Sequence, residues 1–490
     1  MKNTVLGTSI PSPYPELLLS STVPLDSQVP VILSAIQAAQ EDIRATENEV
    51  GDDVLKQRRS ALEEFVQIHR SMVSVIRRLP SEILSEIFSR CSRKWDGCKP
   101  RIFATVCSRW RDVALATPRL WCNVWVDREE VKPQSLSFLL SLQLERSGQV
   151  PLSVVFSDPF IAPCILESLI AVSHRWESVD LVLTGPQREL IHSSNCHFPI
   201  LKRLILQTPS LELGNLSRPL PLLEELSLDG RYFSDDNFEL IEPLLIPPQF
   251  PWTGFTKCSL VQCTAADVLN ILRASPPMED LSLGHCYGPS ERDQEPIPTT
   301  SNIRSLNIRS CNAAFTREFF PCFSAPNLQE LLVDDAEAAI TTTALVALLA
   351  GPSPQITHLR LSRVRASEKD LIVLLRVADA VEHLEISWPW DVHSNTLMEA
   401  LTLLPGNRNR ARPRILPKLR LLSITGGLAC KDESLLTMLE SRCPGLKHVE
   451  LFYAGRTFFF DRSFDGLRKA GMEIDVRFDA PVDSLGRTAS

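Results

Sequence analysis

The sequence contains no long hydrophobic run and no hydrophobic leader. No stretch of eighteen uninterrupted apolar residues occurs anywhere in the 490 residues, which predicts no membrane span and no membrane partner. The first residues, Met1–Gly7, lack the apolar core of a secretory signal peptide. We therefore expect a protein of the cytoplasm, the nucleus or both.

Paired metal-binding cysteines are also missing. The thirteen cysteines include no Cys-x-x-Cys pair and show no dense, regular spacing, which is typical of reduced thiols. His192, Cys196 and His197 are close in sequence, but no fourth ligand for a zinc ion is evident. We expect no metal site.

Residue patterns that carry out catalysis are not apparent either. No glycine-rich phosphate loop occurs, and no ordered set of nucleophile, base and orienting acid can be assembled from the sequence. Composition is ordinary for a globular protein, with 44% hydrophobic residues and a net charge of −8. The length is typical of two to four domains. We predict a protein that is not an enzyme and needs no cofactor.

One short motif, Leu-x-x-Leu-x-Leu, is abundant. Its middle apolar residues recur at intervals of 22 to 38 residues, most often 25, at Val179, Leu204, Leu226, Cys258, Leu281, Leu306, Leu331, Leu359, Leu384, Leu422 and Val449. This period is that of a leucine-rich-repeat solenoid. Helical patterns between the copies make each repeat one strand and one helix. The predicted fold is an α/β solenoid over residues 127–480, a horseshoe with a parallel concave sheet and outer helices.

Several features of the predicted solenoid follow from its register. A helix at Leu136–Arg146 and a buried strand at Leu152–Phe156 come before the first copy. Cysteines fall eight residues after the first apolar residue of three copies, which predicts buried thiols at an inner turn: Cys263, Cys286 and Cys311. The two longest intervals contain predicted loops, at Ile246–Trp252 and Pro405–Pro413. The last residues, 481–490, read as a polar tail.

Side chains alternate along a strand, so the residues flanking each middle position should point into the concave face. The candidate binding residues on this face are Arg309, His358, Arg360, His383, Glu385, His448 and Glu450. Such a mixture of charges suits a protein ligand or a polar small molecule. Two aromatic clusters, Trp388–Trp390 and Phe458–Phe460, favour core or cap positions over an exposed binding rim.

The chain before the repeats divides into three segments. Residues 1–28 are rich in Ser, Pro and Thr, which predicts disorder. Residues 29–75 carry two amphipathic patterns separated at Gly51, which favours an antiparallel helical hairpin over a dimeric coiled coil. Residues 76–126 show three apolar sets typical of short helices, the last one comprising Leu120, Trp121 and Trp125. Three such helices bury only a small core, so their remaining apolar faces need a partner.

Two motifs of residues 76–126 resemble the F-box of fungal F-box proteins. Leu79–Phe88 matches Leu-Pro-x-Glu-Ile-Leu-x-x-Ile-Phe, Val106–Ala114 matches Val-Cys-x-x-Trp-x-x-Val-Ala, and Pro118–Trp121 continues as in many members. The resemblance implies a small all-α F-box domain whose residues dock a Skp-type adaptor, and through it a cullin, or support that surface: Leu79, Pro80, Ile83, Leu84, Ile87, Val106, Cys107 and Trp110. Phe88, Val113 and Trp121 would pack internally. Ser81, Ser85 and the loop of Arg90–Arg101 depart from the usual pattern.

The resemblance implies the substrate-recognition subunit of a Skp–cullin–F-box (SCF) ubiquitin ligase, with the repeats holding an unknown protein substrate. Residues 69–128 carry twelve Lys or Arg against five Asp or Glu, a net charge of +7 that fits the acidic adaptor of that family. Nucleic acid is the less favoured partner of this basic segment, because it lacks interleaved aromatic residues and a recognised motif. A repeat scaffold without ligase function is the alternative.

Overall fold

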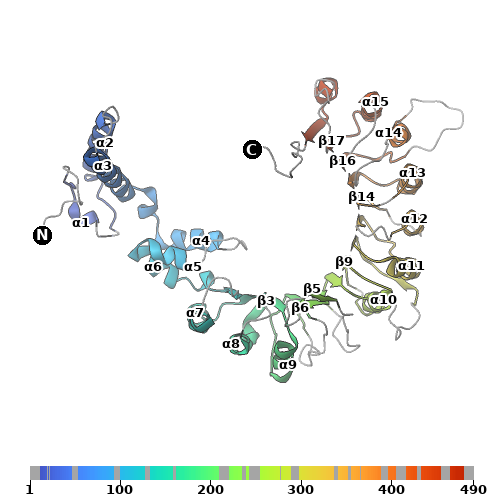
Figure 1. Cartoon of the computed structure of the whole chain (residues 1–490), viewed down its shortest axis with the longest axis horizontal. Helices are drawn as coiled ribbons and strands as arrows, with labels where there is room; N and C mark the ends of the chain where they lie inside the picture. The colour runs from blue at the N-terminus through green and yellow to red at the C-terminus, as the bar shows by residue number, and fades with distance from the viewer. Residues whose placement is uncertain are drawn as a thin grey trace. The chain divides into compact units, whose positions relative to one another are not determined.

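The structure is a computed structural model. It describes residues 11–18, 20, 22–46, 53–92, 100–126, 133–157, 162–208, 220–233, 239–241, 254–275, 277–288, 297–335, 340–350, 355–364, 366–387, 395–403, 415–426, 432–453 and 464–478. The chain forms two compact units (Figure 1), the first comprising Met1–Val124 with Phe138–Val150 and the second Trp125–Ser137 with Pro151–Ser490.

The first unit is helical. Its described elements are α1 (Pro15–Leu18), α2 (Val29–Thr46), α3 (Asp53–Met72), the 3-10 helix η1 (Val75–Arg78), α4 (Ser81–Cys91), α5 (Pro100–Val106), α6 (Ser108–Leu115), η2 (Pro118–Leu120) and most of α7 (Pro133–Arg146). Helices α2 and α3 share a core in which Ile32, Ile36 and Ala39 of α2 are buried with Leu62 and Phe65 of α3. The apolar stripe therefore pairs the two predicted helices, while the predicted turn at Gly51 lies outside the described residues.

The prediction of disorder for residues 1–28 is wrong for the described part that begins at residue 11. Leu17 of α1 is buried in the core of α2 and α3. The ring of His69 joins this packing, with Nδ1 2.8 Å from the Phe65 carbonyl oxygen and Nε2 2.9 Å from Ser12 Oγ. Burial lowers the pKa of His69, which favours the neutral ring. Four helical residues are too few to give a periodic signal in the sequence.

The short helices of residues 76–126 enclose a core of their own. Its buried members are Leu84, Phe88, Phe103, Val113, Ala114, Leu120 and Trp121. The rings of Phe88 and Phe103 stack with centroids 4.4 Å apart, and Trp110 packs against Phe88 at 4.7 Å. The indole N–H of Trp121 donates to the carbonyl oxygen of Ala114 at 2.8 Å, which satisfies a buried polar group.

The helical assignment of Trp125 is wrong. Trp125 lies in strand β1 (Asn123–Val126), where exposed and buried side chains alternate. The reason is local, because two valines at alternate positions favour a pleated strand with one buried face over a helical turn. The sheet therefore begins at residue 123, before the predicted boundary at 127.

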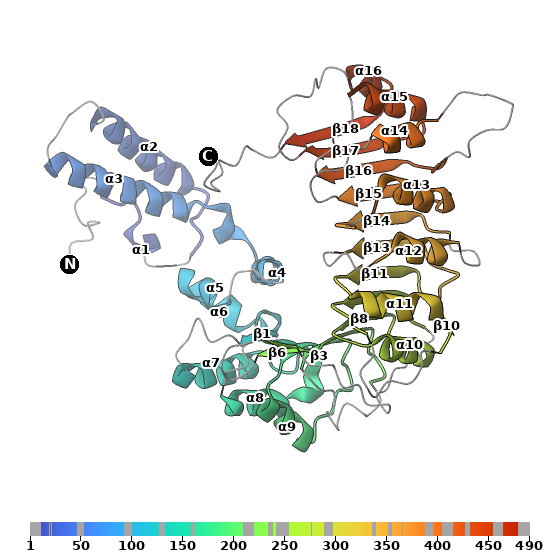
Figure 2. The ribbon, with the colours of Figure 1, turned by 45° about the vertical axis from the view of Figure 1, so that its right-hand side comes forward.

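Fourteen described strands form one sheet in the order β1-β2-β3-β4-β5-β8-β9-β11-β13-β14-β15-β16-β17-β18 (Figure 2). Beyond β1 their bounds are β2 Leu152–Phe156, β3 Trp176–Val182, β4 Arg203–Gln207, β5 Glu225–Asp229, β8 Lys257–Val261, β9 Asp280–Gly284, β11 Ser305–Arg309, β13 Glu330–Asp334, β14 His358–Ser362, β15 His383–Ser387, β16 Leu421–Gly426, β17 His448–Tyr453 and β18 Glu473–Phe478. Two short pairs lie outside it, β6 (Arg231–Phe233) with β7 (Glu239–Ile241), and β10 (Thr299–Thr300) with β12 (Phe323–Ser324).

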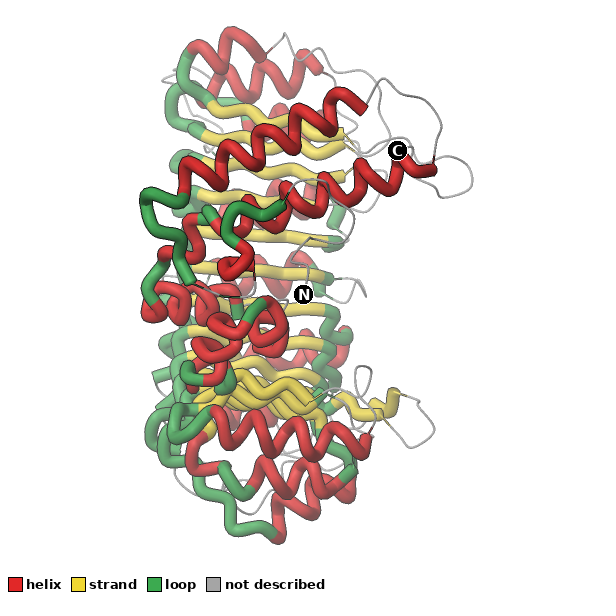
Figure 3. Tube along the Cα trace, turned by 90° about the vertical axis from the view of Figure 1, so that its left-hand side faces the viewer, coloured by secondary structure: helices red, strands yellow, loops and turns green. Residues whose placement is uncertain are grey.

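Helices cover one face of this sheet. In Figure 1 they follow the outer side of the curved sheet, and Figure 3 shows the strands stacked as successive rungs. Their bounds are α8 Pro163–Ile170, η3 Ser173–Arg175, α9 Gly185–Ser193, α10 Ala265–Ala274, α11 Ala313–Cys322, α12 Thr342–Leu349, α13 Glu368–Val377, α14 Asn395–Leu401, α15 Asp432–Arg442 and α16 Asp465–Lys469. The expected α/β solenoid is confirmed, with all eleven predicted repeat strands and Leu152–Phe156 in place.

Within the fourteen-stranded sheet, the strands from β2 to β18 run parallel, and equivalent repeat positions are directly opposed. Leu281, Leu306, Leu331, Leu359 and Leu384 are Cα partners in successive strands, and each is at most 2% exposed. This stack of leucines fills the space between sheet and helices. Each repeat therefore buries its apolar face mainly against its two neighbours.

The inner turns after the strands repeat in detail as well. The residue directly after β8, β9, β11 and β14 has a left-handed backbone, at Gln262, His285, Ser310 and Arg363 with φ between 47° and 65°. After β8, β9 and β11 the next residue is a buried cysteine, Cys263, Cys286 or Cys311, so these predicted inner-turn thiols are confirmed as packed. Burial raises the pKa of Cys263 and Cys286, which keeps both thiols protonated and poorly reactive.

A buried arginine ties two repeats together. Arg442, at the end of α15, is 4% exposed, and its guanidinium donates to the carbonyl oxygens of Leu401, Ile415 and Leu416, each at 2.8 Å. Burial lowers its pKa to about 10. The guanidinium thereby joins the end of α14 to the segment before β16.

Several predicted features lie outside the described residues. They are the loops at 246–252 and 405–413, the aromatic clusters at 388–390 and 458–460, and the tail at 481–490.

Replacing Arg442 by alanine should destabilise the second unit. The substitution leaves three buried carbonyl groups without their donor, so we expect the free energy of unfolding to fall by about 2–4 kcal/mol. Urea unfolding followed by circular dichroism, with hydrogen exchange of the β16 and β17 amides, measures the loss. Arg376→Ala, on the exposed side of α13, is the control and should change stability by less than about 0.5 kcal/mol. Equal effects of the two substitutions would contradict the bracing role.

Candidate functional site

The face of the sheet opposite the helices carries the candidate binding residues in columns. Pairing from β14 to β18 aligns His358, His383, Leu421, His448 and Glu473 as successive Cα partners. The next column on the same face contains Arg360, Glu385, Ser423, Glu450 and Asp475. The predicted registration is confirmed, and adjacent side chains in a column start about 4.8 Å apart.

The first cluster on this face lies on β14 and β15. The rings of His358 and His383 meet edge to face with centroids 4.1 Å apart. Arg360 Nε donates to Glu385 Oε2 at 2.5 Å, so the second column begins with a neutralised ion pair. Partial burial, followed by the neighbouring His358, lowers the pKa of His383. At neutral pH the His383 ring is therefore uncharged, and it lies beside the exposed hydrogen-bonding groups of His358 and Arg360.

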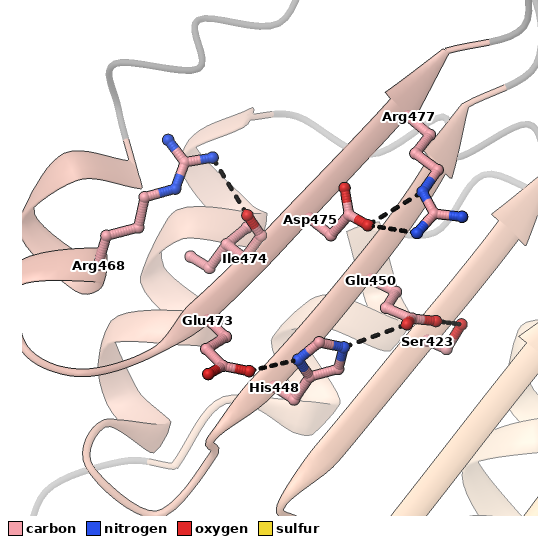
Figure 4. Close-up of polar contacts among 8 residues, drawn as sticks. All are labelled: Ser423, His448, Glu450, Arg468, Glu473, Ile474, Asp475 and Arg477. Carbon is pink, nitrogen blue, oxygen red and sulfur yellow. Dashed lines mark hydrogen bonds and ion pairs between the residues drawn. The ribbon is translucent and has the colours of Figure 1, made fainter. Parts of the chain in front are cut away.

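The second cluster lies on β16, β17 and β18 (Figure 4). His448 is held between two carboxylates, with Nε2 3.1 Å from Glu450 Oε1 and Nδ1 3.2 Å from Glu473 Oε2. Ser423 donates its hydroxyl to Glu450 Oε2 at 3.2 Å. The hydrogen bond to Glu450 is the largest cause that raises the pKa of His448, and the same bond lowers the pKa of Glu450. Carboxylates only accept, so two flanking carboxylates fit the protonated imidazolium.

Most other charges near these clusters are paired across strands or within one. Arg363 forms two contacts of 2.6 Å with Asp334, and Arg477 lies 2.6 Å from Asp475. Exposed pairs of this kind add little stability, since solvent screens them. They fix the positions of donors and acceptors on the open face. Arg309, the remaining candidate, is exposed at the end of β11, with Nε 3.4 Å from Asn307 Oδ1.

Metal binding gains no geometric support in the described part of the chain. No group of three His, Cys, Asp or Glu side chains is placed there to hold an ion. Cys196 is buried, with Sγ 4.0 Å from the carbonyl oxygen of Ile191. The arrangement on the open face can donate and accept hydrogen bonds toward a polar ligand or a protein surface.

The eight residues predicted to dock or support an adaptor divide by exposure. Ile83 and Ile87 lie four residues apart on α4 and are 49% and 38% exposed, and Val106 on α5 is 57% exposed. Pro80 is also exposed. Leu84 is fully buried among the helices, so it supports the domain and cannot contact a partner directly.

The remaining three of the eight residues act mainly inside the helical segment. Leu79 and Trp110 pack against the core formed by Leu84 and Phe88. Cys107 precedes α6 and its Sγ accepts from the Trp110 backbone N–H at 3.5 Å, as a helix cap. Phe88, Val113 and Trp121 pack internally, as predicted.

Two residues were missed in the sequence. Ile102 was given no role at the adaptor surface, but it is 48% exposed, four residues before Val106 on α5. Its spacing from Val106 is the signal that could have identified it. Arg109 donates to the carbonyl oxygens of Arg77, at 2.5 Å, and of Leu79, which fixes the entry to α4. No local pattern predicts that long-range contact.

Four exposed aliphatic residues on α4 and α5 form what we name the apolar quartet: Ile83, Ile87, Ile102 and Val106.

No family model matches the chain, and no curated protein matches it significantly. Among the described helices, none combines the length and hydrophobicity needed to cross a bilayer. The open face of the sheet and the apolar quartet are therefore the features that bear on function.

Replacing Glu450 by glutamine should lower the pKa of His448, because its main hydrogen-bonding partner loses its charge. The folded-state pKa of His448 lies above the ordinary 6.5, so the contribution of the protonated ring to stability is full below pH 6.5. That contribution disappears as the pH rises through the folded-state pKa. NMR titration of the histidine ring carbons measures the shift. Glu433→Gln, at an exposed position of α15, should leave the His448 titration unchanged; no difference between the variants would contradict this assignment.

Proposed function

We propose that the chain is the substrate-recognition subunit of an SCF-type ubiquitin ligase. The short-helix segment docks a Skp-type adaptor, and the open face of the solenoid binds the substrate protein. The observation that carries the proposal is the apolar quartet, four exposed branched aliphatic side chains on helices whose own core is already filled by Leu84, Phe88 and Phe103. The protein would act in the cytoplasm or nucleus, where its thiols stay reduced.

Exposed apolar side chains, one turn apart on each of two helices, favour a protein partner. Ile83 and Ile87 are one turn apart on α4, and Ile102 and Val106 one turn apart on α5. The stacked rings of Phe88 and Phe103 bring α4 into contact with α5. Clustered exposed hydrophobic residues of this kind mark interaction sites, because leaving them in water is unfavourable. The resemblance of Leu79–Phe88 and Val106–Ala114 to the F-box motif favours a Skp-type adaptor as this partner.

Charge near these helices supports an acidic partner. Arg101 and Arg111 are exposed on α5 and α6, within the segment whose net charge is +7. Long-range attraction by such a segment accelerates association with an acidic protein. Arg109 is engaged by backbone carbonyl oxygens and serves positioning.

The open face would hold the substrate while the adaptor and cullin supply the ubiquitin-charged enzyme. Candidate contacts are the exposed groups Arg309, His358 and Arg360 and the cluster of His448 and Glu450. The chain would contribute proximity, raising the effective concentration of substrate near the enzyme. A repeat scaffold without ligase function, the alternative, would use the same open face and need no adaptor.

The double variant Ile83→Glu, Ile87→Glu should abolish capture of the adaptor. Both side chains are exposed, so two carboxylates there disrupt docking without removing core contacts. The full chain is immobilised and incubated with purified Skp-type adaptor, and bound adaptor is quantified. We expect at least about a hundredfold loss of affinity, the size typical for charges placed in an apolar contact.

Val373→Glu is the matched control, since Val373 is 47% exposed on α13 of the second unit. This variant should bind the adaptor as the parent protein does. Circular dichroism must show equal folding of all three proteins. If the parent chain fails to bind adaptor, the ligase proposal is lost and the scaffold function is favoured; unchanged binding by the double variant would refute docking through the quartet.

A further inference from the structure

The last strand of the sheet has a free side among the described residues. β18 pairs with β17 and is the terminal strand in the sheet order. Helix α16 comes before it in the chain, and no described helix follows. Six residues of edge strand are long enough to pair with another strand, which is why natural proteins usually protect such edges.

The direction of the backbone groups on β18 is fixed by its pairing with β17. The N–H of Glu473 donates to the carbonyl oxygen of Lys447 at 2.8 Å, so the backbone of Glu473 faces β17. Backbone directions alternate along a strand. Asp475 and Arg477 therefore also turn their backbones toward β17, and Ile474, Val476 and Phe478 turn theirs outward. In agreement, the outward carbonyl oxygen of Ile474 accepts from Arg468 at 3.2 Å.

We propose that two copies of this chain associate by antiparallel pairing of their β18 strands, centred on Val476. A twofold axis at Val476 opposes Val476 to itself and Ile474 to Phe478 of the second copy. All of these residues have outward backbones, so each opposed pair exchanges two hydrogen bonds, about six in total. The proposal is independent of adaptor binding, because it uses a different unit of the chain.

Charges on the open face select this register. With Val476 on the axis, Asp475 of one copy opposes Arg477 of the other, twice by symmetry. Moving the axis to Ile474 would instead oppose Glu473 to Asp475, two carboxylates. Opposite charges across strands stabilise a pair and like charges destabilise it. Val476 is only partly buried in one copy, so pairing also covers an apolar side chain.

Arg468 competes with this association. Its guanidinium occupies the Ile474 carbonyl oxygen that the second copy would use, and it also lies 3.8 Å from Asp465. Pairing requires this guanidinium to leave the carbonyl. Arg468 therefore opposes strand pairing at this edge, and removing its side chain should strengthen association.

Sedimentation velocity of the full chain over a concentration series tests the pairing. The parent protein should show a monomer–dimer equilibrium. Arg477→Asp and Asp475→Arg should each weaken it about tenfold or more, since each creates like charges across the axis. The double swap Asp475→Arg, Arg477→Asp should restore the dimer. Arg468→Ala should tighten it. Glu330→Arg, at an exposed position of interior strand β13 on the same face, is the control and should have no effect.

Three results would overturn the proposal. The first is a parent protein that stays monomeric up to about 100 µM, since a specific pairing should have a dissociation constant below that concentration. The edge would then be covered by this chain or left unpaired. The second is a dimer that the single charge reversals leave intact, which would place the interface elsewhere. The third is a double swap that fails to restore association while circular dichroism shows native folding.

Discussion

Vertical registration of repeats is the constraint on which the rest of the second unit depends. Because Leu306 is opposed to Leu331, and Leu331 to Leu359, each repeat completes the core of the next. The same registration aligns the open-face side chains into columns and brings His358 beside His383. One pairing pattern thus sets both the packing of the core and the arrangement of side chains on the open face. A shift of one residue in a strand would turn its core side chains to the open face and its open-face side chains to the core.

Repetition explains why the sequence predicted the solenoid so fully. Eleven copies of one pattern reinforce each other, so the strands at Cys258 or Val449 could be located although each copy alone is weak. The single strand β1 and the short α1 have no copies to support them, and both were missed. The columns followed from strand alternation, so the candidate residues were also predictable.

Contacts made over long distances in sequence were beyond prediction. Nothing near Arg442 indicates that its guanidinium binds three carbonyl groups, and nothing near Arg109 indicates its hold on Leu79. The exposure of Ile102 was also not predicted, since an apolar residue in a helical pattern gives no sign of whether its own domain or a partner covers it. Leu84 is buried and Ile83, its neighbour in sequence, is exposed. A rotation of one residue around the helix therefore decides whether an apolar side chain faces the core or a partner.

Ion pairing between neighbouring repeats constrains how this solenoid could have grown. Arg360 pairs with Glu385 of the next repeat, while its other neighbour in the column is Leu332. If the repeat containing β14 were duplicated alone, two arginines would lie side by side and one would lack its carboxylate. Duplicating β14 together with β15 would keep each Arg360 beside a Glu385. Growth of the solenoid here by two repeats at a time would therefore keep arginine and glutamate alternating along this column of the open face.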